Sequence, residues 1–125
     1  MGGGPLVLFL QRGSWQDRYQ AVTLAVTAAA LGDQVILALF AEPLRLWVAG
    51  RFDDGAPPEA AGARVQGLAQ SLGEARRELG LEVVACDTAV RLAGLDPEAL
   101  GTALDRLATL PTLWKAAREG QLVVI

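Results

Sequence analysis

The feature that most constrains this chain is the alternation of short apolar runs with longer segments of helical periodicity. Four runs rich in Val, Leu and Ile have the length of strands, and they cover residues 5–10, 34–40, 81–85 and 121–125. A further short strand is expected within residues 105–110. Because helical segments separate these runs, instead of two-residue turns, neighbouring strands are expected to pair in parallel. The pattern predicts an α/β fold, a three-layer α/β/α arrangement with a mostly parallel sheet of about five strands.

Two of the segments between the runs predict long helices. Residues 15–31 carry apolar or small side chains nearly all round, with Ser14 placed to cap the start and Gly32 placed to follow the last turn. Such a helix packs one face on the sheet and leaves another either for a neighbouring subunit or for burial within the chain. Residues 63–79 have one apolar stripe and predict an amphipathic helix that Gly80 ends.

The remaining segments predict shorter elements. Residues 44–48 predict a short helix, and residues 50–62 combine glycine, proline and acidic residues without a period, which predicts a loop able to border a site. Residues 88–93 predict another short helix, and Asp96 followed by Pro97 is the typical opening of a further one. A last helix is expected from Pro111 to Gly120.

Length and charge exclude several classes of protein. At 125 residues the chain has the size of one domain, residues 1–125, and its formal net charge is -3 without a basic stretch. Direct binding to nucleic acid or to an anionic membrane surface is therefore not expected. The apolar runs are far shorter than the roughly 20 residues that span a bilayer, and the start lacks the basic segment of a secretory signal. A single cysteine forms no intrachain disulfide, so the reducing cytoplasm is the expected location.

The chain contains no histidine, which limits the chemistry available to it. Zinc sites need several Cys, His or carboxylate ligands, and most serine or cysteine hydrolases need a histidine base. We therefore expect no metal site, and no cofactor is expected either.

The predicted sheet brings several reactive or charged side chains to one edge. In an open parallel sheet, ligands bind beyond the carboxyl ends of the strands. Three segments leave such ends, namely residues 11–18, 41–47 and 86–91. If their strands are neighbours, the candidate site residues on this edge are Cys86, Arg12, Trp15, Asp17, Arg18, Glu42 and Thr88. The alternatives are that the tryptophan only packs in the core and that Asp17 and Arg18 form a surface ion pair.

Cys86 is the only thiol and ends an apolar strand immediately before a predicted helix. The thiolate is the reactive form of cysteine, and the N–H groups at a helix start stabilise a negative charge. Asp87 opposes this effect, so a strongly reactive Cys86 needs a nearby cation, for which Arg12, Arg18 and Arg51 are the candidates. The alternative is a structural Cys86, because free cysteine is among the most buried residue types.

The segment LEVVACDTAVRLAGLDPEAL, together with the first strand, the alanine-rich helix and the second strand, resembles the DsrE/DsrF-like family of small sulfur-relay proteins. The matching positions in this segment are Cys86, Ala89, Gly94 and Leu95. The resemblance implies a helix-covered parallel sheet and a homo-oligomer, a trimer or hexamer. It also implies that Cys86 carries sulfane sulfur as a persulfide between sulfur donor and acceptor proteins, which would make the protein a sulfurtransferase subunit.

A second hypothesis stays open beside the sulfur carrier. In it, the protein is a non-enzymatic oligomeric module that binds a small anionic ligand or a partner segment at the same edge, and Cys86 is structural. The reactivity of the thiol in the folded protein distinguishes the two hypotheses.

Overall fold

The computed structural model describes residues 3–125 and contains one five-stranded sheet in the order β4-β3-β2-β1-β5. Every neighbouring pair of strands is parallel, which confirms the predicted α/β class. The strands are β1 (Leu6–Leu10), β2 (Val35–Leu39), β3 (Glu82–Ala85), β4 (Arg106–Leu107) and β5 (Gln121–Val124). The central strand β2 is buried at all five positions, as its uninterrupted apolar run predicted.

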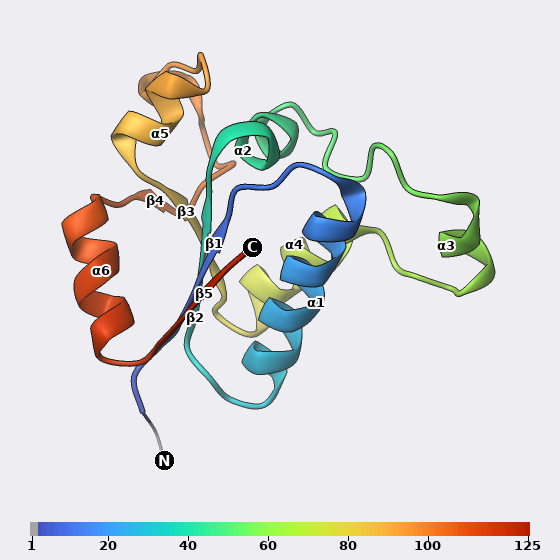
Figure 1. Ribbon diagram of the computed structural model, residues 1–125, viewed down its shortest axis with the longest axis horizontal. Coiled ribbons are helices and arrows are strands. Elements are labelled where there is room, and N and C mark those ends of the chain that lie inside the picture. The colour runs from blue at the N-terminus through green and yellow to red at the C-terminus, as the bar shows by residue number, and fades with distance from the viewer. Residues whose placement is uncertain (1–2) are drawn as a thin grey trace.

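Helices cover both faces of the sheet and complete the three layers. On one face lie α1 (Trp15–Ala30) and α4 (Leu68–Glu78), and on the other lies α6 (Leu110–Arg118), as Figure 1 shows. The apolar interior is accordingly divided in two. The larger part is formed by the α1 and α4 side of the sheet, and the smaller part includes Val7, Ile36 and Leu113 under α6.

The longest helix, α1, begins and ends close to the predicted residues. The side-chain oxygen of Ser14 accepts a hydrogen bond from the N–H of Asp17 at 3.1 Å, and Gly32 follows the helix in the left-handed conformation, with φ of 99°. Among residues 3–125, no helix has both the length and the apolar character that a bilayer crossing requires.

The helix predicted for residues 63–79 was wrong at its start, because α4 begins only at Leu68. The first turn is capped from a distance, since the carboxylate of Asp53 accepts the N–H groups of Leu68 and Ala69. Residues 63–67 form a turn and an irregular segment before the helix. The loop predicted for residues 50–62 also contains a short helix, α3 (Pro58–Gly62), which projects away from the sheet in Figure 1.

Four shorter elements also differ from the predictions. The helix after β2 is longer than predicted, α2 (Ala41–Val48), and the one after Cys86 starts one residue early, α5 (Asp87–Leu92). The helix expected at Asp96 is a single 3-10 turn, Pro97–Ala99, and Gly101 follows it in the left-handed region with φ of 58°. The strand expected within residues 105–110 pairs over only two residues, because the chain turns into α6 at Leu110.

Candidate functional site

The carboxyl ends of β3, β2 and β1 lie side by side at one edge of the sheet. These strands are adjacent and parallel, with Leu37 opposite Val83 and Leu10 opposite Leu39. The arrangement confirms that the three segments considered in the sequence leave neighbouring strands. The predicted site residues on those segments nevertheless do not form one site, because they lie in different surroundings along this edge.

Cys86 occupies the turn between β3 and α5 and is the N-cap residue of that helix. Its backbone is extended, with φ of -84° and ψ of 153°, and its Sγ accepts a hydrogen bond from the N–H of Ala89 at 3.2 Å. The carbonyl of Cys86 accepts the first N–H of the helical pattern, from Val90, at 3.0 Å. The side chain is half-buried. The sulfur therefore serves as the capping acceptor at the start of α5.

Cys86 also lines a cavity of about 410 Å³ between the end of β2, the start of α5 and the start of α6. The cavity wall is largely apolar, and its lining includes Phe40, Cys86, Thr88, Leu92, Leu110 and Pro111. The predicted site residue Thr88 is thus close to the thiol. No arginine or lysine is among the cavity residues in the part of the chain that the structure describes, and the charged one is Asp87.

The charge of Asp87 is balanced by the next turn of the same helix. The Nε of Arg91 donates to the Asp87 carboxylate at 2.9 Å, and this hydrogen bond raises the pKa of Arg91 above its ordinary value. Both side chains are exposed, so water and salt weaken the pairing. Arg91 was not among the predicted cations. It is the arginine that balances the negative charge of Asp87, the residue next to the thiol.

Arg18 has a different role from the one considered in the sequence. Its side chain is only 3% exposed and donates hydrogen bonds to the main-chain carbonyls of Gly13, Phe52 and Asp54. Burial lowers the pKa of Arg18 below its ordinary value, while nearby acidic side chains act in the opposite direction. Arg18 thus connects the segment after α2 to the start of α1 by hydrogen bonds. Arg51, another of the predicted cations, pairs with Asp54 in the same segment at 2.7 Å.

Arg12 and Asp17 line a second cavity, of about 320 Å³, at the ends of β1 and β5. The main-chain N–H groups of Gln11 and Arg12 both donate to the carbonyl of Ile125, which fixes this corner. The carboxylate of Asp17 accepts the hydroxyl of Ser14 at 2.7 Å. The cavity lining does not include Cys86.

Trp15 and Glu42 complete the predicted set, and the structure places them in different surroundings. Trp15 is buried and stacks on Tyr19 with ring centroids 5.2 Å apart, and within residues 3–125 its indole N–H has no hydrogen-bond acceptor. Glu42 is exposed and pairs with Arg45 at 2.9 Å. A Cβ added to Gly13 would lie 2.8 Å from the Cβ of Glu42, so the absence of a side chain at Gly13 allows the two loops to approach.

Two exposed leucines, Leu92 and Leu110, line the Cys86 cavity, and the exposed Trp114 lies one turn beyond Leu110 on α6. None of the three was among the predicted site residues. Leu92 is 81% exposed on α5, and Leu110 and Trp114 are both about half exposed on α6. The last two are four residues apart and therefore lie on the same flank of the helix. The sequence did contain a signal for this surface. Leu113 and Ala117 form the buried face of α6, so apolar residues at the other spacing, Leu110 and Trp114, had to lie outside that face.

Two further observations bear on the identity of the site. Among residues 3–125, the structure brings together no group of three or more Cys, Asp or Glu side chains that could hold a metal ion. No model of a known protein family matches the chain, and no curated protein matches it in sequence.

Proposed function

We propose that this protein carries sulfane sulfur as a persulfide on Cys86 and passes it to a partner protein. The observation that supports the proposal most strongly is the position of the Cys86 sulfur. It accepts the N–H of Ala89 at a helix start and borders a cavity whose wall is largely apolar. The resemblance of the segment around Cys86 to sulfur-relay proteins agrees with this chemistry.

The transfer is a thiol exchange extended by one sulfur atom. The Cys86 thiolate attacks the outer sulfur of a donor persulfide, R–S–SH, and a bond forms between the Cys86 sulfur and that atom. The bond between the two donor sulfurs breaks, its electron pair leaves with the inner sulfur as the thiolate R–S⁻, and the proton stays with the moving group. Delivery repeats the same step with Cys86 as the leaving thiolate. No oxidant or reductant is consumed, and neither step needs a histidine.

The surroundings of Cys86 fit both steps. The N–H of Ala89 stabilises negative charge on the sulfur when it attacks and again when it leaves. The apolar wall formed by Phe40, Leu110 and Pro111 limits the access of water to the bound persulfide. The exposed fractions of Leu92 and Trp114 provide apolar surface for the docking of a donor or acceptor protein.

The single cysteine determines what else the proposal requires. A chain with one thiol cannot release sulfur through an internal disulfide, so donor and acceptor must each bring their own sulfur atoms. The proposed setting is the cytoplasm, where thiols stay reduced. The proposed partners are proteins and copies of the chain itself, and not nucleic acid, since the formal net charge is -3.

One observation favours the alternative of a structural cysteine in a binding module. As N-cap of α5, the Cys86 sulfur satisfies an N–H that would otherwise have no partner, and the side chain packs against the larger part of the core. Both functions therefore use the same contact, and the reactivity of the thiol separates them.

The discriminating experiment is alkylation of the native protein with iodoacetamide, followed by mass spectrometry, with circular dichroism showing that the fold persists. The carrier predicts modification of Cys86 in the folded protein at least as fast as that of a small free thiol at neutral pH. A thiol that reacts only after unfolding in urea would contradict the carrier and leave the binding module.

A further inference from the structure

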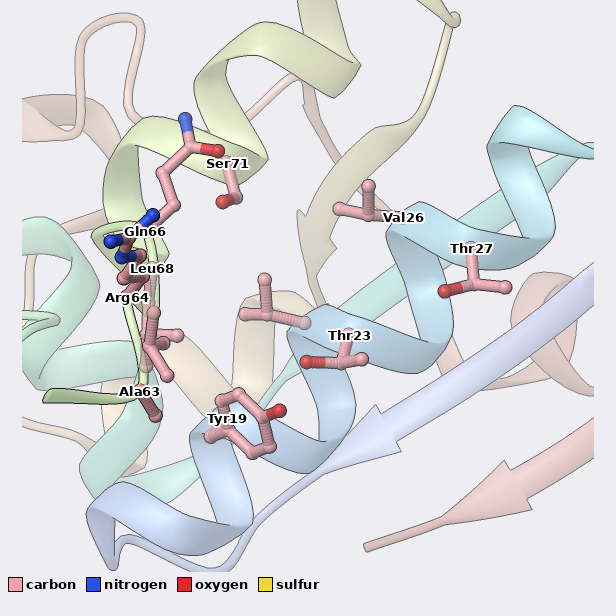
Figure 2. A pocket seen from close by; sticks show the side chains of 11 residues that line it. Tyr19, Thr23, Val26, Thr27, Ala63, Arg64, Gln66, Leu68 and Ser71 are labelled. Carbon is pink, nitrogen blue, oxygen red and sulfur yellow. The ribbon is translucent and has the colours of Figure 1, made fainter. Parts of the chain in front are cut away.

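A groove runs between α1 and α4 on the side of the sheet away from α6. One part of it, about 320 Å³, lies between Tyr19, Thr23 and Thr27 of α1 and residues 63–71 (Figure 2). A second part, about 270 Å³, continues along α4 to Leu79. The two parts share Val26, Gln66 and Ser71, so they form one continuous groove beside α1.

The ridge of α1 that borders this groove carries no charge. From Tyr19 to Leu31 the sequence contains no Asp, Glu, Lys or Arg, although the outward positions are exposed. Those exposed positions are Gln20, Thr23, Thr27 and Ala30. A helix that faces water normally has charged residues on its outer face, and the buried centre of a protein–protein interface is depleted of them.

Two of the most exposed leucines lie where these helices end. Leu31, immediately after α1, is 80% exposed, and Leu79, immediately after α4, is 43% exposed and lines the groove. Both are neutral and apolar, so their burial would be favourable by the hydrophobic effect. Together with the ridge they make this face suited to close contact with another protein surface.

The two ends of the groove carry opposite charges. Arg64 lines the end beside Tyr19, and Glu74 and Glu78 line the opposite end. Within the described part of the chain, neither Arg64 nor Glu78 forms an ion pair. The carboxylate of Glu74 accepts the side-chain amide of Gln66 at 3.0 Å. A surface that is positive at one end and negative at the other is complementary to itself when one copy is turned end to end.

We propose that a second copy of this chain binds this face across a twofold axis near the middle of the groove. The uncharged ridge of α1 from each copy packs into the groove of the other, in the manner of helix ridges in grooves. Turning one copy end to end brings Arg64 toward Glu78 of the partner subunit, and the symmetry repeats this pair. The contact leaves the Cys86 cavity free, because the lining of that cavity shares no residue with the groove.

The first test measures the molar mass of the full chain by light scattering during gel filtration, over a range of protein concentrations. The expected result is a dimer or a larger even-numbered assembly. Thr27→Arg places a charge on the ridge and should halve the mass. Thr112→Arg, a matched change at an exposed threonine of α6, should leave the mass unchanged. A monomer at all concentrations, or an assembly that Thr27→Arg does not alter, would overturn the proposal.

The second test addresses the antiparallel placement through a charge exchange. Arg64→Glu and Glu78→Arg should each weaken dimerisation about tenfold, because symmetry places each like-charge contact twice in the dimer. The double variant Arg64→Glu with Glu78→Arg should return the dissociation constant to within about threefold of the original value, because the exchange restores a pair of opposite charges at both symmetric positions. Single variants that weaken dimerisation without rescue in the double variant would reject the proposed end-to-end geometry. Circular dichroism of all variants separates loss of association from loss of fold.

Discussion

The main-chain N–H of Ala89 donates a hydrogen bond to the Sγ of Cys86 over 3.2 Å. The contact closes the first turn of α5, so the only thiol of the chain caps a helix and receives a main-chain donor. The capping role explains the place of the cysteine in the fold, and the proposed sulfur transfer uses the same atom.

Substitution of Cys86 separates its capping role from packing. Cys86→Ser keeps an acceptor at the N-cap, and serine is a preferred residue there, so the free energy of unfolding should change by less than about 1 kcal/mol. Cys86→Ala removes the acceptor and should cost about 1 kcal/mol. Urea denaturation followed by circular dichroism measures both. A loss well above about 1 kcal/mol for Cys86→Ser would instead indicate that the thiol is a tightly packed core residue.

The charges beside the thiol should change its rate of reaction. Asp87→Asn removes a negative charge next to the sulfur and should accelerate alkylation, whereas Arg91→Gln leaves Asp87 unbalanced and should slow it. The expected changes are about two- to fivefold, the size of an exposed ion-pair interaction, and should shrink in high salt. Pseudo-first-order rates at low and high ionic strength give the comparison. Equal rates for all three proteins at low salt would mean that the pair does not act on the thiol.

The exposed leucine beside the cavity should matter for delivery and not for uptake. Leu92→Gln should leave stability within about 0.5 kcal/mol, because the side chain is exposed, and should leave uptake from a small persulfide unchanged. Transfer of sulfur from Cys86 to an acceptor protein should slow. Val124→Gln is the control, with an exposed apolar side chain on β5, which lies at the edge of the sheet opposite β4. Equal slowing in both variants would argue against docking at the cavity.

Arg18 should contribute mainly to stability. Arg18→Met keeps much of the apolar volume but leaves the carbonyls of Gly13, Phe52 and Asp54 without their donors, at a cost of about 3 kcal/mol. Arg18→Lys should recover only part of this, because an ammonium cannot reproduce the planar fork of a guanidinium. Urea denaturation gives the cost, and limited proteolysis should show cleavage of residues 50–67. Unchanged stability in Arg18→Met would contradict the fastening role.

The sequence was sufficient to predict the layers and most of the strands. Uninterrupted apolar runs such as Val35–Leu39 are typical of strands covered on both faces, and helical crossovers make the sheet parallel. The start of α4 could not be predicted, because its cap is the Asp53 carboxylate, which is distant in sequence from Leu68. Local patterns contain no information on such a partner.

The candidate site was only partly predictable. The position of Cys86 at a strand end before a helix followed from the apolar run and the small residues after it. The separation of Arg18 from the thiol could not be predicted. The partners of Arg18 are main-chain carbonyls, which are present at every position and leave no pattern in the sequence. The cavity also needs β4 beside β3, which brings Leu110 and Pro111 next to Cys86, and a two-residue strand leaves almost no pattern.

The most direct test of the central claim is the intact mass of the folded protein after incubation with a small persulfide donor, and again after addition of an acceptor thiol. The account predicts a gain of one sulfur atom, mapped to Cys86, that the acceptor removes, and no gain in Cys86→Ser. A native protein that gains no sulfur, or a Cys86→Ser variant that gains it equally, would contradict the account.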